Sequence, residues 1–408
     1  MFRKKKEDIQ GSLSRMAWRK FRRNPVSLGS LVFIGISALV AILGYLVTPD
    51  STPFANHQHL EISTHKPGHM ALMLNVRKNA PPVRSTFLKK MIRGKPSEWN
   101  TLPIQRYWFE GGWLHYETYG GQADYPGLED RIWLPDVLFA IAHEQEQAEA
   151  VNDSLTFIAL SGERLSLSVQ EMHHQAEEEH IRTRRFYLGT DRFGRDLLSQ
   201  LVIGTRVSLS VGFIAVFISL VIGITLGSLA GYFRGKFDDL VMWLINVIWS
   251  IPTLLLVIAI TFAIGKGFWQ VFLAVGLTMW VDVARVARGQ VLSLREKEFV
   301  EAGRVLGLGS GRIILHHILP NIMGPVIVIS AANFASAILI EAGLSFLGIG
   351  VQPPMPSWGT MIREHYGYII LDKGYLAFLP GLLIMLMVLA FMLTGNGLRE
   401  ALDKTPQY

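Results

Sequence analysis

The sequence predicts an all-α polytopic membrane protein with six transmembrane helices and a large extracytoplasmic α+β insertion between helices 1 and 2. Half of the 408 residues are hydrophobic and only 18% are charged, whereas soluble proteins carry about 25% charged residues. The apolar residues gather in long uncharged runs, most of them after Arg206. Basic residues cluster beside these runs, so membrane topology explains the net charge of +6 without a nucleic-acid partner.

Six runs predict transmembrane helices. Residues 26–47 form 22 uncharged positions, and at about 1.5 Å per residue this run crosses about 30 Å of hydrocarbon. A signal-peptide core has about 7–15 residues, so we expect an uncleaved span. The fourth run is the shortest and extends through Asp282 and Arg285 near one end. The predicted spans are residues 26–47, 207–233, 240–264, 268–281, 322–340 and 374–398.

The distribution of Lys and Arg predicts the orientation. The arm of residues 1–25 carries nine basic residues and should remain cytoplasmic. Six spans then place the basic loop 285–321 and the C-terminal residues 399–408 on the same side, whereas losing one span would put that loop outside. We therefore predict a multi-pass protein of the plasma (inner) membrane with cytoplasmic N- and C-termini.

Three local patterns within the spans indicate helix packing. Gly223, Gly227 and Gly231 are spaced by four, so they form a small-residue face for another helix. Pro252 is expected to kink the third span. Asp282 and Arg285 are three residues apart, and they either pair on the helix face or mark a functional charge.

Residues 48–186 lack a spanning run and predict a small folded domain. Gly111-Gly112 separates two aromatic-rich segments, and residues 161–164 separate two apolar ones, so two hairpins are expected. Residues 136–151 are expected to form a short helix.

The same segment holds nine histidines without a compact ligand pattern. A transition-metal site is conceivable, but no metal ligand is predicted. Three of these histidines, His173, His174 and His180, lie in a glutamate-rich stretch, where a solvated helical face or linker is the preferred interpretation. The nine histidines are His57, His59, His65, His69, His115, His143, His173, His174 and His180.

Two absences limit the chemistry of the chain. Without cysteine there is no disulfide, thiolate zinc site or cysteine nucleophile. Without a Gly-x-x-x-x-Gly-Lys-Ser/Thr loop the chain should not hydrolyse ATP. We therefore predict no catalytic residue and no cofactor.

The cytoplasmic segment at about residues 290–321 is the most informative stretch. It predicts two short helices around a turn containing Gly307, Gly309 and Gly311. Phe299, Ala302 and Leu306 lie on one helical face, and Pro320 is placed to open the next helix. Such an element either docks in a groove of a partner or lies on the membrane surface.

This segment resembles the coupling loop of binding-protein-dependent ATP-binding-cassette importers. The family pattern is Glu-Ala-Ala, three residues, Gly, about nine residues and Ile-x-Leu-Pro. Here Gly303 replaces the second Ala, and His317 stands at the Ile position beside Ile318. The resemblance implies an ATPase-coupling role for Glu301, Ala302, Gly303, Gly307, Leu319 and Pro320.

Further motifs resemble the dipeptide/oligopeptide/nickel branch, and within it the second (C-type) permease. The arm at residues 18–25 looks similar to that of the family, and Gly395-Asn396-Gly397-Leu398-Arg399 departs from its ending by Asn for Asp. The first motif contains Gly189, Thr190, Asp191, Gly194, Arg195 and Asp196. The second motif contains Glu341, Ser345, Gly348, Gly350, Pro353, Pro354, Trp358 and Gly359.

The resemblance covers residues 15–47 and about 187–404, and it leaves the insertion unexplained. The spans, the basic loops and the resemblance together predict a cytoplasmic arm (1–25), a first span (26–47), an extracytoplasmic insertion (48–186) and a permease core (187–408). The implied partners are a second permease subunit, two ATP-hydrolysing subunits, an extracytoplasmic solute-binding protein and the lipid bilayer.

The resemblance implies import of peptides or similar small solutes, with nickel or another small solute as the alternative. A secondary transporter driven by an ion gradient would show paired repeats and mid-membrane ionisable groups, which are scarce here. A membrane-anchored sensor would not require six spans and this cytoplasmic segment.

Overall fold

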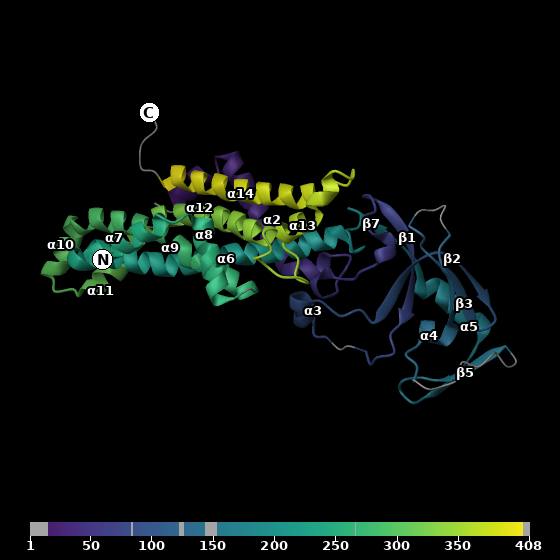
Figure 1. Cartoon of the computed structure of the whole chain (residues 1–408). Coiled ribbons are helices and arrows are strands. Elements are labelled where there is room, and N and C mark those ends of the chain that lie inside the picture. The colour runs from purple at the N-terminus through teal and green to yellow at the C-terminus, as the bar shows by residue number, and fades with distance from the viewer. Residues whose placement is uncertain (1–14, 83–84, 122–125, 143–152, 266, 403–408) are drawn as a thin grey trace. The chain divides into compact units, whose positions relative to one another are not determined.

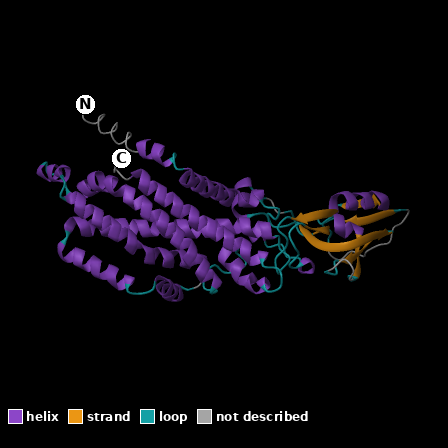
Figure 2. Ribbon diagram, turned by 90° about the horizontal axis from the view of Figure 1, so that it is seen from above, coloured by secondary structure: helices purple, strands orange, loops and turns teal. Residues whose placement is uncertain are grey.

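A computed structural model of the chain describes residues 15–82, 85–121, 126–142, 153–265 and 267–402. The backbone divides into two compact units (Figure 1). The helical unit contains Met1–Ala41, Gly204–Arg363 and Ala377–Tyr408, and the mixed unit contains Ile42–Ile203 and Glu364–Leu376. Strands occur in the mixed unit, where Figure 2 draws them in orange.

The helical unit consists of long apolar helices and the short segments that connect them. A few terminal residues of α2, α6, α13 and α14 belong to the mixed unit. Its elements are α2 (Pro25–Val47), α6 (Leu197–Phe233), α7 (Gly235–Trp249), α8 (Thr253–Ile264), α9 (Phe268–Arg295), α10 (Glu298–Val305), α11 (Ser310–Ile313), the π turn η4 (Ile314–Ile318), α12 (Leu319–Phe346), α13 (Trp358–His365) and α14 (Tyr375–Leu402).

Five helical segments among the described residues are long and apolar enough to cross a bilayer, and there are six if the bent pair α7–α8 counts as one span. The five are α2, α6, α9, the continuous run Ser310–Phe346 and α14. The structure therefore supports a predominantly helical polytopic fold. A segment that crosses hydrocarbon has to satisfy its backbone hydrogen bonds internally, as an α-helix does.

The predicted third span is broken, not merely kinked. α7 and α8 meet at an angle of 96°, and Pro252 has an extended ψ of 125° before α8 begins. Proline disfavours helical geometry at the residue before it and donates no backbone N–H. The kink predicted at Pro252 is therefore a sharp break between two helices.

Packing between α6 and α9 organises the helical unit. A Cβ atom added to Gly227 would lie 2.4 Å from the carbonyl oxygen of Ala284, and one at Gly223 would lie 2.6 Å from Cβ of Val283. At Gly231 the nearest atom would be the carbonyl oxygen of Arg288, at 2.8 Å. The predicted small-residue face is therefore confirmed, and it lets the two backbones approach closely.

The mixed unit contains an antiparallel five-stranded sheet in the order β4-β3-β2-β1-β7 and a separate hairpin β5–β6. The strands are β1 (His69–Arg77), β2 (Trp99–Glu110), β3 (Trp113–Thr118), β4 (Glu129–Trp133), β5 (Ser154–Ile158), β6 (Arg164–Ser168) and β7 (Ile181–Phe186). The helices and turns are η1 (Pro53–Ala55), η2 (Leu60–Ile62), α3 (Phe87–Arg93), α4 (Leu134–Leu138), α5 (Val169–Gln175), η3 (Ala176–His180) and η5 (Tyr366–Ile369).

Both predicted hairpins are confirmed, since β2 pairs with β3 and β5 pairs with β6. They contribute to a core that includes Leu114, Trp133 and Phe157, each 1% exposed or less. The predicted helix at 136–151 is wrong in extent. α4 ends at Leu138, because Phe139 turns extended (φ −122°, ψ 154°), and residues 143–152 lie outside the described part.

We expect Gly227→Ala to destabilise the helical unit by about 1–3 kcal/mol, because the new methyl group would meet backbone atoms that cannot rotate away. The matched control is Gly289→Ala on α9, where a Cβ meets nothing within 4 Å. That control should be neutral or more stable by up to about 1 kcal/mol, because alanine favours helix. Thermal unfolding of both variants in detergent measures the difference, and equal midpoints would contradict the packing argument.

Candidate functional site

The segment between α9 and α12 has the predicted form of two short helices around a glycine turn. α10 ends in a Schellman motif: Gly307 N–H donates to Arg304 O (2.9 Å) and Leu308 N–H donates to Gly303 O (3.0 Å). This motif requires a left-handed residue after the helix, and Gly307 has φ +74°. The glycine of the motif therefore sets the angle at which the chain leaves α10.

α10 turns part of its apolar surface outward. Val300 and Gly303 are buried beside the core residues Ile313 and Ile318. In contrast, Phe299 is 42% exposed and Leu306 is 79% exposed. A neighbouring residue, Val305, is 83% exposed. Apolar side chains at this density on one short helix are typical of a docking surface, and the face expected from Phe299, Ala302 and Leu306 is exposed.

Both departures from the family pattern are accommodated by the structure. A Cβ added to Gly303 would meet Leu308 and Ile313 at 3.6–3.8 Å, which is ordinary contact. His317 is half-buried, while the adjacent Ile318 is fully buried. The π turn η4 holds both residues, and the helix runs on through it, so Pro320 lies in the first turn of α12 without starting a separate helix.

In the first motif, two glycines allow the backbone before α6 to lie against residues 59–66. Gly194 has φ +70°, and a Cβ there would lie 1.7 Å from the carbonyl oxygen of His59. Gly189 has φ +80°, and a Cβ there would lie 2.3 Å from the carbonyl oxygen of His65. Thr190 adds two hydrogen bonds, donating to Ile62 O (2.5 Å) and accepting from His65 N (2.9 Å).

The charged residues of this motif form a buried ion-pair network. Arg195 Nε lies 2.5 Å from Asp191 Oδ2, and its Nη2 lies 2.9 Å from Glu364 Oε2. Asp191 Oδ1 also accepts from the backbone N–H groups of Phe193 and Arg195. Asp196 accepts from Ser199 N–H (3.0 Å) at the start of α6, as an N-capping carboxylate does.

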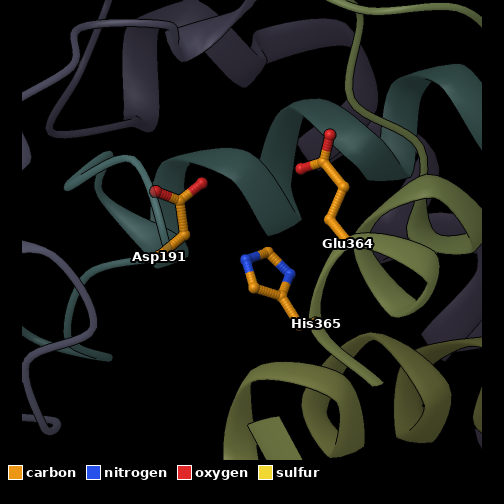
Figure 3. A group of neighbouring side chains, drawn as sticks. All are labelled: Asp191, Glu364 and His365. Carbon is orange, nitrogen blue, oxygen red and sulfur yellow. The ribbon is translucent and has the colours of Figure 1, made fainter. Parts of the chain in front are cut away.

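Asp191, Glu364 and His365 bring ligand-type atoms within 4.8 Å of one another. Figure 3 shows these three side chains, Asp191 from the loop before α6 and the other two from the end of α13. The two carboxylates already share the Arg195 guanidinium as their cation. A metal ion would have to displace that positive charge, so the arrangement fits an ion-pair network better than a metal centre.

The second motif converges on the buried carboxyl group of Glu341. Ser345 Oγ donates to Glu341 Oε1 (2.7 Å), and Ser208 Oγ from α6 donates to Oε2 (3.3 Å). Glu341 and Ser345 are both 0% exposed. Since a buried carboxyl group needs hydrogen-bond partners, this cluster holds α6 and α12 in a defined register.

Other residues of the second motif permit close approach to this cluster. A Cβ added to Gly350 would lie 2.2 Å from Ser345 Oγ, and one at Gly359 would lie 2.7 Å from Cα of Ala342. Trp358 is 1% exposed and packs where Gly204 leaves room. Gly348 has φ +78°, and Pro353 and Pro354 are joined by a cis peptide bond. The motif thus folds the chain after α12 back onto it.

The described histidines of the insertion do not gather into one cluster. His57 pairs with His59 at 4.6 Å between ring centroids, and His65 pairs with His69 at 4.0 Å. His173 stacks on Phe109. The expectation of a solvated face is wrong for His180, which is 3% exposed and whose Nδ1 lies 2.7 Å from Asn75 O. His143 lies outside the described residues.

Burial lowers the pKa of His59 to about 3, and the nearby positive charge of His57 and Arg184 acts in the same direction. Burial also lowers the pKa of His69 to about 4, with His65 contributing. Both imidazoles are therefore neutral at pH 7.

Sequence reasoning missed one arrangement in the helical unit. Asp282 and Arg285 do not pair with each other among the described residues. Both contact Trp249 instead: its indole N–H donates to Asp282 Oδ1 (3.2 Å), and Arg285 lies over its ring at 3.5 Å from the centroid. Trp249 reaches α9 because α7 packs along that helix, with Val241 and Ile245 in one core cluster with Trp280 and Ala284. Pro252 marks the end of this stretch in the sequence, but it does not show which helix Trp249 contacts.

Two family models match the chain. The model described as binding-protein-dependent transport system inner membrane component matches residues 223–407. The model described as N-terminal TM domain of oligopeptide transport permease C matches residues 12–82. Residues 83–222 lie outside both matches.

Among curated relatives, the dipeptide transport system permease protein DppC of Alkalihalophilus pseudofirmus is 42% identical over 217 residues, which is 53% of this chain and 71% of the relative. The di/tripeptide permease DppC of Pseudomonas aeruginosa is 44% identical over 54% of this chain and 72% of its own length. This chain belongs to the family of binding-protein-dependent transport system inner membrane components.

The permease is similar to further relatives. The oligopeptide permease OppC of Haemophilus influenzae is 42% identical over 53% of this chain and 70% of the relative. Among solved structures, the inward-facing MetNI methionine ABC transporter aligns with 51% of the permease and 98% of its own chain, at 20% identity and a TM-score of 0.42. The family match and the peptide-permease relatives show that the permease is a membrane-spanning transport component of an ATP-binding-cassette importer, a family that relies on separate ATPase and substrate-binding partners.

We expect the stability of the mixed unit to fall between pH 6.5 and pH 3 because of His59. The unfolded chain takes up a proton near the ordinary histidine pKa of 6.5, whereas folded His59 does so only near 3. At pH 5.5 the loss should be about 1.4 kcal/mol, and stability should return fully above the unfolded pKa. Urea unfolding followed by tryptophan fluorescence at pH 7.5 and 5.5 measures it.

His59→Gln should remove the His59 share of the loss, about 1.4 kcal/mol at pH 5.5, and leave the share of buried His69. His174→Gln serves as a control because the His174 side chain is 71% exposed. If His59→Gln keeps the full pH dependence, His59 does not cause it.

Proposed function

We propose that this permease translocates peptides or similar small solutes across the plasma (inner) membrane, driven by separate ATPase subunits. The names of the relatives support the substrate class, since they refer to dipeptide, di/tripeptide, oligopeptide and glutathione transport. A peptide has a polar backbone and two charged ends, so it cannot cross hydrocarbon without a protein path.

The exposed face of α10 is the observation that carries the coupling mechanism. Phe299, Val305 and Leu306 have no partner in the described chain that covers them, since each is 42–83% exposed. We assign this face to ATPase docking. Movement of the ATPases then acts on α9 and α12, because α10 connects them through a fixed glycine turn and a buried apolar cluster.

The coupling role extends to the motif residues that shape the segment. In this proposal Glu301 and Ala302 face the ATPase, Gly303 allows close packing beneath them, and Gly307 sets the turn. Leu319 and Pro320 lie where the helix from α11 continues through η4 into α12, which transmits the movement. The residues of the two longer motifs act differently: they hold the chain before α6 and after α12 in shape, and we assign them no direct contact with solute.

Six spans account best for the topology, with α7 and α8 together forming one broken span. The segment between α9 and α12 carries Lys297, Arg304 and Arg312, and basic loops are retained in the cytoplasm. This arrangement leaves both termini cytoplasmic and places residues 48–186 outside. A second permease subunit, forming a heterodimer, two ATPases and an extracytoplasmic solute-binding protein complete the importer.

Glu301→Lys should abolish most uptake while leaving insertion intact, because it reverses a charge on the proposed docking face. Peptide uptake and copurification of the ATPase subunits, both at equal membrane level, measure the effect. Glu163→Lys, an equal charge change in the exposed β5–β6 turn, is the control and should keep both. Normal uptake by Glu301→Lys would refute the assignment of this face.

The absence of cysteine allows a direct test of topology. In intact cells Ser161→Cys, in the β5–β6 turn, should react with a membrane-impermeant maleimide. Ser293→Cys, on the last part of α9, should react only after lysis. Both side chains are exposed, so burial does not explain a difference. Labelling of Ser293→Cys in intact cells would contradict six spans.

A further inference from the structure

A half-open cavity of about 320 Å³ lies where α7 breaks from α8, with α9 and α12 as its other walls. Half of its ten lining residues are apolar, and the rest carry polar atoms. The polar lining consists of Trp249, Thr253, Thr278, Asp282 and Ser336. A volume of this size corresponds to the lower end of small-molecule sites, which begin at about 300 Å³.

Asp282 contributes a carboxyl group to the cavity wall from a candidate membrane helix. It is near the middle of α9, and an ionisable group within a spanning helix is by default a functional candidate. No cation forms an ion pair with Asp282 in the part of the chain that the structure describes. The nearest cation on the same helix, Arg285, lies against the ring of Trp249.

The geometry leaves the carboxylate able to accept more hydrogen bonds. The indole N–H of Trp249 reaches Oδ1 (3.2 Å), and no donor from the described residues reaches Oδ2. Thr278 lies one turn before Asp282 and donates its hydroxyl proton to Val275 O (2.8 Å). Its oxygen can still accept a hydrogen bond. Two acceptors one turn apart on one helix fit a group that carries several N–H donors.

The cavity lies between the end of α7 at Trp249 and the start of α8 at Thr253. Broken helices with their ends at mid-membrane commonly form ion or solute sites in transporters.

We propose that this cavity holds the positively charged ammonium group of a solute in transit, with Asp282 as its counter-charge. The apolar residues of the wall, among them Met279 and Leu339, then receive the uncharged part of the solute. The inference rests on the proposed transport function for the identity of the solute, a short peptide with a free amino terminus. The charge preference of the cavity can be tested without knowing the solute.

The first experiment uses the cysteine-free chain in its complete importer complex. Ser336→Cys places a thiol in the cavity wall, and its reaction rates are measured with cationic 2-aminoethyl and anionic 2-sulfonatoethyl methanethiosulfonate. Each rate is divided by that of a small free thiol. The cationic reagent should react faster by about tenfold or more, because a fixed charge in a cleft concentrates its counter-ion. Asp282→Asn should remove this preference.

Two further variants separate a direct role of the carboxylate from a structural one. Asp282→Glu should restore the preference, because it keeps the charge. Trp249→Phe removes the indole N–H but keeps the carboxyl group of Asp282, so the preference should persist. If Trp249→Phe and Asp282→Asn lose it equally, Asp282 only positions Trp249, and the proposal is overturned. Absence of any reaction at Ser336→Cys also overturns it, since the cavity is then closed to water-borne solutes.

The second experiment measures uptake of alanyl-alanine by the reconstituted complex. Asp282→Asn should lower uptake by about tenfold, while ATP hydrolysis stimulated by the solute-binding protein continues. Unchanged uptake would refute the ammonium site. If the wild-type complex takes up no dipeptide while the thiol assay still reports a cation preference, the peptide assignment fails and the cation site stands.

Discussion

The close contact between α6 and α9 is the constraint on which the helical unit depends. Gly223, Gly227 and Gly231 bring the α6 backbone against α9 with no room for a side chain. α9 is the helix that leads into α10 at one end and carries Asp282 near its middle. A fixed α9 therefore sets the position of both the exposed face and the cavity. Within a bilayer, hydrophobic burial does not drive helices together, so the stability of the helix pair depends on close van der Waals packing of this kind.

The motif residues act mainly through backbone geometry. Gly307 ends α10 with a left-handed turn, and Gly194 and Gly350 let one segment lie against another where a Cβ would collide. The polar residues of the motifs add buried ion pairs and hydrogen bonds. Arg195 joins two carboxylates, and Glu341 receives serine hydroxyl groups in a fully buried position. Removing such a partner leaves a buried charge or donor unsatisfied, which costs more than the pair itself contributes.

These fixed turns have a functional consequence. A movement applied to α10 reaches the membrane helices only if the connections bend little, and the turn at Gly307 and the buried residues Val300 and Ile318 supply that stiffness. The cavity beside Trp249 occupies the one place where a candidate span is interrupted among the described residues. Rigid connections at the end of α9 and an interrupted helix near its middle together suit a path that alternates between two states.

The sequence determined the features that repeat at short range. Uncharged runs predicted most of the spans because hydrocarbon excludes charge, glycine-containing turns predicted the hairpins, and Gly307 predicted the turn after α10. Six spans, the orientation and the role of residues 48–186 remain predictions. The tertiary structure decided what depends on long-range contact. It ended α4 at Leu138, separated α7 from α8, and placed Trp249 between Asp282 and Arg285. Residue spacing along one helix predicts only contacts within that helix. Trp249 comes from α7, and its ring contacts both Asp282 and Arg285 of α9 in place of a pair between them.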